Sequence, residues 1–375
     1  MTRISILGTV GIPANYGGFE TLAENLARYH QDNNLPGELM VYCSARSYPE
    51  QPYTCLGARL RYINLNANGV SSVPYDVISL FSAIVRRTDV IVLLGVSGAI
   101  ALPLVRLLSR AKIITNIDGI EWKRAKWKGL ARWFLHYSEK LAVRFSHEVI
   151  ADNGGIAQHV QDCYGRDCHV IAYGGDHAVS AAPKPWQGTD LPARYALSLC
   201  RIEPENNVDM ILDAFSGQNE LSLVFVGNWN NSAYGRELKQ HYAAVPHLQL
   251  LDPVYDIGVL HTLRCNAVLY VHGHSAGGTN PSLVEMMHFG LPVLAYDCVF
   301  NRHTTEQQAL FFSDAEALCQ ALQTLTPAQA EQVGVNMLHI AQARYTWDVI
   351  GAEYFRLAGV LEYQVNPRTE AASSA

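Results

Sequence analysis

Residues 271–296, VHGHSAGGTNPSLVEMMHFGLPVLAY, hold residue types at spacings that suit an anionic ligand. Asn280 is a typical N-cap, and Pro281 suits the first helical position, where its missing N–H costs nothing. Three small residues, through which backbone N–H groups can approach an anion, precede this helix start: Gly277, Gly278 and Thr279. The stretch therefore predicts a phosphate-binding loop. The alternative is an ordinary helix of an α/β domain after a chance glycine loop.

A carboxylate and a helix end complete this stretch. Glu285 falls one turn into the predicted helix, which holds it close to the loop. Gly290 is typical of a helix end, and the apolar residues 291–295 predict a buried strand.

The elements that must position these residues alternate between strands and helices. In the first half of the chain, apolar runs predict strands at 4–8, 39–43, 60–65, 90–94, 112–116, 148–151 and 169–173. Helical spacing follows most of them, at 19–27, 75–87, 98–109, 130–145 and 155–164. This alternation indicates a parallel, doubly wound sheet.

The same alternation restarts after an aperiodic stretch at 174–192. It predicts strands at 195–199, 221–226, 248–251 and 267–271, with helices at 207–215, 232–243 and 257–264. Further helices are expected at 314–325, 327–345 and 347–363. Residues 271–296 then begin at the end of the strand predicted at 267–271, in a second Rossmann-like domain. Their loop lies at the carboxyl edge of its sheet, where open α/β sheets bind ligands.

Length and composition agree with two soluble domains. A chain of 375 residues exceeds the size at which single cores stop growing. A net charge of −6 argues against a general nucleic-acid binder. The cysteines are scattered, and the sequence enters a strand at once without the apolar core of a signal peptide, so we expect a cytoplasmic protein. The most apolar run, 90–105, is too short to span a bilayer.

Two Rossmann-like domains facing a cleft fit dehydrogenases, two-domain binding proteins and nucleotide-sugar glycosyltransferases. A dinucleotide site requires G-x-G-x-x-G directly after a strand. The first loop reads GTVGIPANYGGFE from Gly8 to Glu20, which is longer and differently spaced. The dehydrogenase class is therefore disfavoured.

The motifs GTVGIPANYGGFETLAENLA, NIDGIEWKRAKW, ADNGG, AYGGD, RIEPENN and HGHSAGGTNPSLVEMM resemble those of glycosyltransferase family 4, which are retaining enzymes of the GT-B fold. Within that family, the chain is most similar to bacterial rhamnosyltransferases of surface polysaccharide assembly. The likeness extends to about residue 363.

On the donor side, the resemblance implies that Glu285 binds the ribose of a nucleotide sugar and that Arg201 neutralises its diphosphate. Asn206 stands where the family has a lysine, so a polar contact replaces one positive charge. Gly277 stands where the family often has a second glutamate. Asn280 or His274 is then expected to recognise the sugar, together with backbone amides of the loop that contains Gly278 and Thr279.

On the acceptor side, the resemblance implies that Asp118 orients or deprotonates an acceptor hydroxyl, with Glu121 as the weaker candidate. Asp152 and Tyr173 end two predicted strands and are further candidates for catalysis, the alternatives being a helix N-cap and domain packing. Gly17 and Gly18 would lie under the diphosphate or the acceptor, or would form only a strand-to-helix turn.

Residues 122–144, WKRAKWKGLARWFLHYSEKLAVR, hold seven Lys or Arg, three Trp and one acidic residue. Basic residues attract anionic headgroups and Trp suits the interface, so we expect this segment to lie on a membrane surface. The alternative is a solvated helix face.

The sequence and the resemblance together predict transfer of L-rhamnose from dTDP-L-rhamnose to a saccharide on a polyprenyl diphosphate, at the inner face of the plasma membrane. We expect no metal and no cofactor besides this co-substrate, because Arg201 and a helix N-terminus can neutralise the diphosphate without a metal ion. A UDP- or GDP-linked donor, a sugar-nucleotide epimerase or hydrolase, and a non-enzymatic binding protein are the alternatives.

The expected domains are an acceptor-binding domain, a linker, a nucleotide-sugar-binding domain, a closing helix and a disordered tail, over residues 1–177, 178–192, 193–346, 347–363 and 364–375.

Overall fold

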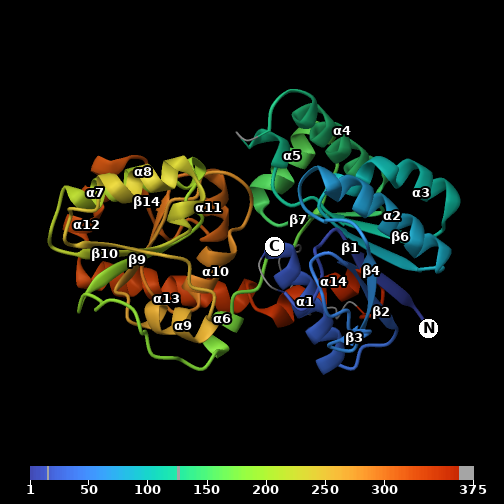
Figure 1. Cartoon of the computed structure of the whole chain (residues 1–375), viewed down its shortest axis with the longest axis horizontal. Helices are drawn as coiled ribbons and strands as arrows, with labels where there is room; N and C mark the ends of the chain where they lie inside the picture. The colour runs from blue at the N-terminus through green and yellow to red at the C-terminus, as the bar shows by residue number, and fades with distance from the viewer. Residues whose placement is uncertain (15–16, 125–126, 363–375) are drawn as a thin grey trace, which may run out of the picture. The chain divides into compact units, whose positions relative to one another are not determined.

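A computed structural model of the chain describes residues 1–14, 17–124 and 127–362. These residues form two β-sheets with helices packed around them (Figure 1). The predicted basic residue Lys126 and the predicted tail lie outside the described residues. The chain folds into two compact units. The first unit contains Met1–Asn116, Arg144–Val149 and the stretch that begins at Gly351, and the second contains Ile117–Val143 and Ile150–Ile350.

The first sheet has eight strands in the order β3-β4-β2-β1-β5-β6-β7-β8. Their bounds are Arg3–Leu7 (β1), Glu38–Ser44 (β2), Thr54–Cys55 (β3), Ala58–Ile63 (β4), Val90–Leu94 (β5), Lys112–Asn116 (β6), Glu148–Ala151 (β7) and His169–Val170 (β8). Strand β1 pairs in parallel with β2 on one side and β5 on the other, so the strand order reverses there. The short β3 was not predicted, and it pairs antiparallel with β4.

The helices that belong with this sheet include Gly18–Asp32 (α1), Ser72–Val85 (α2), Leu102–Leu108 (α3), Gly129–Phe145 (α4) and Gly154–Tyr164 (α5). Helix α14, Trp347–Leu357, follows much later in the chain. In the first unit, Tyr354 of α14 accepts a hydrogen bond from the Asn116 side chain at 2.7 Å. Phe355 stacks on Tyr29 of α1 with ring centroids 5.9 Å apart. The part of α14 that begins at Gly351 therefore packs into the core of the first unit.

The second sheet has six strands in the order β11-β10-β9-β12-β13-β14. Their bounds are Tyr195–Leu199 (β9), Ser222–Val226 (β10), Leu248–Leu251 (β11), Leu269–His272 (β12), Val293–Tyr296 (β13) and Leu310–Phe312 (β14). Every pair in this sheet is parallel. The strand order reverses between β9 and β12, which places the carboxyl ends of these two strands at the position where open α/β sheets bind ligands.

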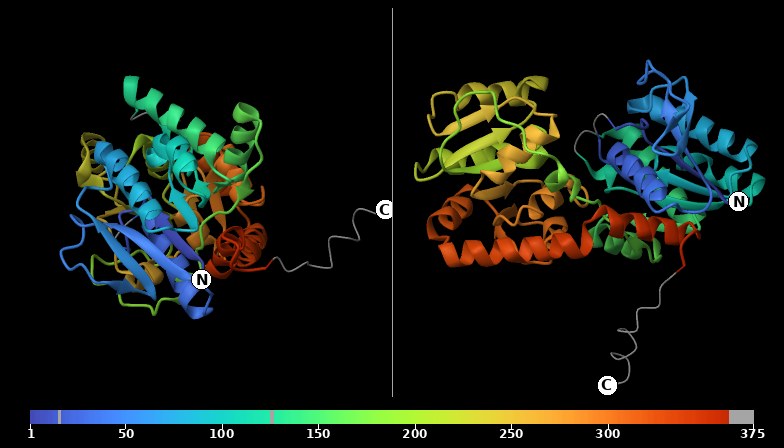
Figure 2. Two further views of the ribbon diagram at one scale, coloured as in Figure 1. Left: turned by 90° about the vertical axis from the view of Figure 1, so that its right-hand side faces the viewer. Right: turned by 90° about the horizontal axis from the view of Figure 1, so that it is seen from below.

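Helices pack on both faces of this second sheet. Their bounds are His177–Ser180 (α6), Val208–Ser216 (α7), Ala233–His241 (α8), Ile257–Cys265 (α9), Pro281–Met287 (α10), Val299–Thr304 (α11), Ala315–Thr324 (α12) and Pro327–Arg344 (α13). Figure 1 shows α7, α8 and α12 on one side of the sheet and α9 and α13 on the other. The long α13 stands out in the right-hand view of Figure 2.

The core of the second sheet explains this layering. Phe215 of α7, Phe225 of β10 and Leu318 of α12 are fully buried together, with Trp229 edge-on to Phe225. Each such side chain contributes about 1.5–3 kcal/mol by leaving water. The predicted alternation of strands and helices is thus confirmed for both sheets, and none of the described helices is long and apolar enough to cross a membrane.

Candidate functional site

The loop between β12 and α10 has the local structure that its residues predict. Asn280 is the N-cap, and its Oδ1 accepts a hydrogen bond from the Ser282 N–H at 3.0 Å. Pro281 occupies the first helical turn. Gly277 has a φ of 103°, a conformation that only glycine adopts without strain. Helix α10 spans seven residues, so its dipole is small and the loop residues carry most of any ligand contact.

Glycines let other segments of the second unit approach this loop closely. A Cβ atom added at Gly119 would lie 2.9 Å from the α-carbon of Gly277. A Cβ added at Gly278 would collide with the carboxylate of Asp152. Thr279 Oγ1 donates to the Asp152 carbonyl at 2.6 Å and accepts from the Asn153 side chain at 3.2 Å. Asp152 and the predicted donor loop therefore share one site.

Asp152 is buried and Asp118 is half-buried, and the charge of Asp118 acts on Asp152. Burial raises the pKa of Asp118, although the charge of Arg124 opposes this rise. Burial and the charge of Asp118 raise the pKa of Asp152 well above its ordinary value. Tyr173 donates to Asp118 Oδ1 at 3.5 Å, whereas Asp152 Oδ1 is buried without a hydrogen-bond partner. Two carboxyls with such different partners can serve as one ionised and one protonated group.

Asp118 also has an unusual backbone, with a φ of 60°. This left-handed conformation costs energy for a residue with a side chain, and Asp tolerates it better than most. Backbone strain of this kind is concentrated at ligand-binding and catalytic positions. It is consistent with the acceptor-side candidacy of Asp118.

Asn206 and His274 form a buried pair beside the loop. Asn206 Nδ2 donates to the Arg201 carbonyl at 2.7 Å, which leaves its Oδ1 to accept from His274 Nδ1 at 2.7 Å. His274 is therefore the Nδ1–H tautomer. Burial, with the charges of Arg124 and Arg201, lowers the pKa of His274 to about 3. At neutral pH its Nε2 is thus a hydrogen-bond acceptor, 3.2 Å from the position that a Cβ of residue 277 would take.

Asn206 has protein partners at both ends of its amide, Arg201 and His274. The polar contact with the diphosphate that the sequence predicts stays a prediction, and it would use the second N–H of the amide. Arg201 itself follows β9, and its side chain is 41% exposed, with Glu203 3.7 Å away. Arg201 is accordingly able to reach a ligand, while Asn206 positions its neighbours.

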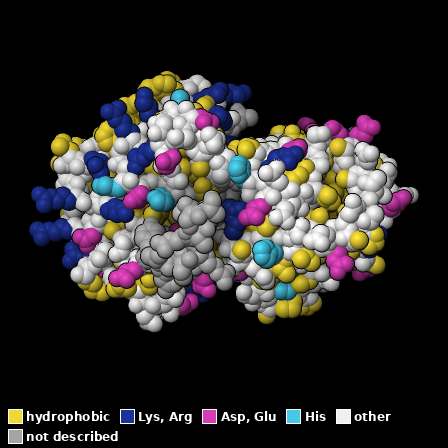
Figure 3. Space-filling model, turned by 180° about the vertical axis from the view of Figure 1, so that it is seen from behind, with side chains coloured by type: hydrophobic (Ala, Val, Ile, Leu, Met, Phe, Trp, Pro, Cys, Tyr) yellow, Lys and Arg dark blue, Asp and Glu magenta, His cyan; other side chains and the backbone are white. Residues whose placement is uncertain are grey.

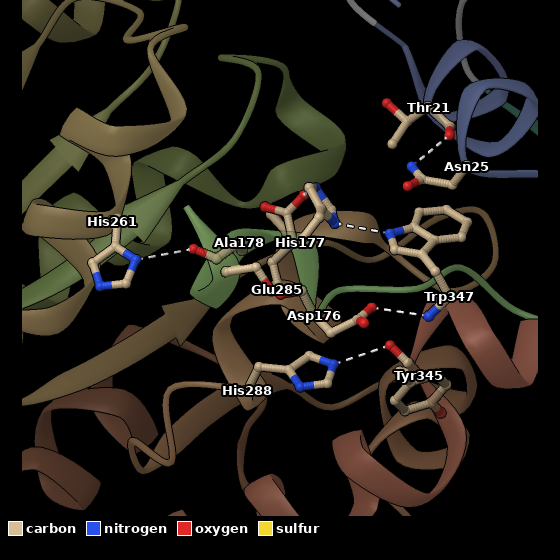
Figure 4. Close-up of polar contacts among 12 residues, drawn as sticks. Thr21, Asn25, Asp176, His177, Ala178, His261, Glu285, His288, Tyr345 and Trp347 are labelled. Carbon is tan, nitrogen blue, oxygen red and sulfur yellow. Dashed lines mark hydrogen bonds and ion pairs between the residues drawn. The ribbon is translucent and has the colours of Figure 1, made fainter. Parts of the chain in front are cut away.

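Glu285 has two partners that the sequence did not reveal, Arg264 and His177, of which Figure 4 shows His177 beside it. One carboxylate oxygen pairs with Arg264 of α9, and the other lies 3.3 Å from Nε2 of His177 of α6. Burial alone would raise the pKa of Glu285, but Arg264 and His177 outweigh it and the pKa lies below its ordinary value. Glu285 is thus a fixed carboxylate at the base of α10.

His177 connects Glu285 to the start of α14. Its Nδ1 accepts a hydrogen bond from Trp347 Nε1 at 3.0 Å, and Asp176 Oδ1 accepts from the Trp347 backbone N–H at 2.9 Å (Figure 4). No sequence pattern marks His177 or Arg264. A histidine in an aperiodic stretch and a lone arginine in a helix usually belong to the surface.

Glu121 and Arg124 lie in the short segment that follows Asp118. Arg124 Nε is 3.1 Å from Glu121 Oε2, and its Nη1 is 4.0 Å from Glu205 Oε1. The side chain of Arg124 is only 16% exposed. Glu121 also accepts a hydrogen bond from Trp127 Nε1 at 2.8 Å. The structure thus shows Glu121 as a partner of Arg124 and Trp127.

Gly17 and Gly18 belong to the first unit. Gly17 has a φ of 135°, and Gly18 begins α1. The Gly17 carbonyl accepts hydrogen bonds from the Thr21 backbone and side chain at 3.1 and 2.9 Å. Glu20 accepts from the Val10 N–H at 2.8 Å, which ties the glycine loop to the start of the helix. The predicted loop geometry is present, and its ligand remains a prediction.

Metal ligands do not gather in the part of the chain that the structure describes, where no group of three or more His, Cys, Asp or Glu could hold an ion.

Two family matches cover separate parts of the sequence. Residues 1–176 match a domain of unknown function, DUF1972, and residues 186–326 match the family described as glycosyl transferases group 1. Among curated proteins, none matches the sequence significantly.

Solved structures resemble the whole chain. Sucrose-phosphate synthase from Thermosynechococcus elongatus gives a TM-score of 0.75 at 18% identity, over 100% of both chains. A glycosyltransferase from Rickettsia africae gives 0.73 at 13% identity, over 97% of this chain and 99% of that one. Alr3699/HepE from Anabaena, in complex with UDP and glucose, gives 0.70 at 15% identity, over 96% and 100%. At these identities the likeness shows the fold, which is GT-B. The match of residues 186–326 to glycosyl transferases group 1 agrees with this fold.

Proposed function

We propose that the protein is a retaining glycosyltransferase that moves L-rhamnose from dTDP-L-rhamnose to a saccharide carried on a polyprenyl diphosphate, in the assembly of a cell-surface polysaccharide. The observation that carries the donor part is the set of side chains at the carboxyl edge of the second sheet. Arg201, His274 and Glu285 stand beside a glycine loop at the point where the strand order reverses. The choice of rhamnose rests on the motifs in the sequence.

In this proposal each donor residue has a distinct task. Arg201 pairs with the diphosphate as it leaves, since a cation stabilises the developing negative charge. Glu285, held by Arg264 and His177, accepts hydrogen bonds from the ribose hydroxyls. Nε2 of His274 accepts a hydrogen bond from a sugar hydroxyl, where Gly277 leaves room for the sugar.

Asp118, Asp152 and Tyr173 act on the acceptor side. Arg124 and Tyr173 favour the ionised form of Asp118, which then accepts the proton of the acceptor hydroxyl or orients it. Asp152, whose raised pKa favours the protonated form, can donate a hydrogen bond to the transferred sugar.

The direct test is a screen of dTDP-, UDP- and GDP-linked sugars against polyprenyl-diphosphate saccharides, with the linkage of the product determined. We expect a rhamnosylated lipid from dTDP-L-rhamnose, with the anomeric configuration retained. Transfer only from a UDP- or GDP-linked sugar would overturn the donor assignment. Conversion or hydrolysis of a nucleotide sugar without any acceptor would instead indicate an epimerase or a hydrolase.

We infer further that α4 contacts the membrane that carries the lipid acceptor. Leu130 and Trp133 are 84% and 63% exposed, and Trp133 stacks on the exposed Tyr137 with ring centroids 5.5 Å apart. Exposed basic residues flank these three on the same segment: Lys128, Arg132 and Lys140. In Figure 3, hydrophobic and basic side chains lie together along the upper left edge of the molecule. Apolar residues beside cations suit an anionic bilayer surface.

Two of the three tryptophans in this segment face the protein instead. Trp122 Nε1 donates to the buried Glu139 at 3.0 Å, and Trp127 donates to Glu121. The membrane contact is therefore assigned to Trp133 alone among them. Liposome flotation with anionic vesicles tests this assignment: Leu130→Ser/Trp133→Ser should lose binding, and Tyr53→Ser, at an exposed residue of the first unit, should keep it. Unchanged flotation of the double variant would refute the membrane contact.

A further inference from the structure

We propose that Arg124 is a second cation of the donor-diphosphate subsite, acting beside Arg201; this inference rests on the proposed function. In the sequence, Arg124 belongs to the basic segment that is expected to lie on a membrane. On that interpretation its charge would pair with anionic lipid headgroups. The structure directs the guanidinium into the protein, toward the loop after β12.

The position of Arg124 is the first support. Its Nη2 lies 3.3 Å from the point where a Cβ of Gly277 would stand, and His274 Nε2 lies 3.2 Å from the same point. Because Gly277 has no side chain, a ligand at this loop meets both groups. A glycine at this position therefore opens the loop to one cation and one hydrogen-bond acceptor.

The orientation of the guanidinium is the second support. Glu121 Oε2 lies 3.1 Å from Nε, an ion pair that ties the guanidinium to its own segment. Glu205 is 4.0 Å from Nη1, which is a loose contact that a phosphate oxygen can replace. A guanidinium held in this way loses little conformational entropy when it binds an anion, and it can pair with a phosphate through two parallel N–H groups.

The surroundings of His274 are the third support. Both Arg124 and Arg201 lie near enough to this buried imidazole for their charges to lower its pKa, and His274 itself lies beside Gly277 of the loop. Arg201 is attached to the end of β9, and Arg124 to the segment after β6, so the two charges approach from different elements. A diphosphate carries more negative charge than one exposed arginine neutralises, and Asn206 contributes no charge.

The test measures binding of dTDP and UDP by titration calorimetry, with thymidine and uridine measured by competition. Arg124→Met removes the charge and keeps the length of the side chain, Arg124→Lys keeps the charge, and Lys123→Met is the matched control on the adjacent exposed residue. We expect Arg124→Met to weaken binding of the diphosphates about 10-fold or more, equivalent to roughly 1.4 kcal/mol, with the nucleosides unaffected. Arg124→Lys should lie between Arg124→Met and the unmodified protein, and Lys123→Met should match the unmodified protein.

Each failure has a separate signature. If the unmodified protein bound neither dTDP nor UDP, the proposed function itself would be wrong. If it bound them and both Arg124 variants bound them equally well, the role of Arg124 would be refuted. A loss shared equally by diphosphates and nucleosides would show that Arg124 only supports the local fold, which also overturns the proposal. Should Arg124→Met fail to fold, the Arg124→Lys variant and the salt dependence of dTDP affinity decide the question.

Discussion

The ion pair between Arg264 and Glu285 should make a measurable contribution to the free energy of unfolding. Arg264 is only 2% exposed and Glu285 15%. Removing one partner of a buried pair leaves an uncompensated charge, at a cost of about 3–5 kcal/mol. We therefore expect Arg264→Met and Glu285→Gln each to lower the free energy of unfolding by about that amount. The double variant, which removes both charges, should lose less than either single variant.

Urea unfolding followed by tryptophan fluorescence suits this measurement, because all six tryptophans lie in the unit that contains the pair. The matched control is Arg344→Met, which breaks the exposed pair of Arg344 with Glu306 at 2.8 Å in the same unit. An exposed pair of this kind contributes at most about 1 kcal/mol. The slope of unfolding free energy against urea should stay constant across the variants, so that midpoints can be compared.

The same pair predicts a dependence on pH. The pKa of Glu285 is lower in the folded protein than its ordinary value of 4.5. Its contribution is therefore fully present above that value and is lost as the pH falls through the folded pKa. The gap between Arg264→Met and the unmodified protein should narrow as the pH drops below about 4.5. A single-variant loss no larger than that of Arg344→Met, or additive losses in the double variant, would refute the reasoning.

Three further substitutions test other parts of the site. Asp152→Asn should raise thermal stability more at pH 7 than at pH 4, because a carboxyl whose pKa is raised on folding destabilises the protein once the pH exceeds its unfolded value; equal shifts in Tm at both pH values would contradict this. Gly277→Ala, at a φ of 103°, should cost roughly 1–2 kcal/mol of stability and weaken nucleotide-sugar binding, as calorimetry would show. Asn206→Ala removes the hydrogen bond that fixes the Nδ1–H tautomer of His274, so it should raise KM for the sugar donor. Unchanged kinetics would refute a positioning role for Asn206.

Much of the fold could be predicted from the sequence because the strands are short, continuous apolar runs. Strands β5, β6, β7, β9 and β11 have the predicted bounds. Strand β14 and helix α11 were missed, since Leu310–Phe312 is only three residues long and Val299–Thr304 lacks a helical apolar period. The N-cap at Asn280 was predicted correctly because capping depends on residues that are adjacent in the sequence.

The partners inside the site could not be predicted in this way. Arg264 and Glu285 are 21 residues apart, and His177 is more than 100 residues from Glu285. Their contact depends on how α6, α9 and α10 pack, which no local pattern encodes. Arg124 could not be predicted either. A basic segment predicts charged side chains at the surface, whereas the fold turns this one side chain inward.

The buried carboxylate of Glu139 has an effect that reaches beyond its own hydrogen bonds. It accepts hydrogen bonds from Trp122, from Tyr164 at 2.6 Å and from His159 at 3.0 Å, so it clamps the segment before Arg124 to both α4 and α5. Trp122 stands two residues before Arg124, and Trp133 precedes Glu139 on α4. Because Glu139 lies on α4 and holds Trp122, a displacement of α4 would also shift the segment that carries Arg124 beside the loop after β12.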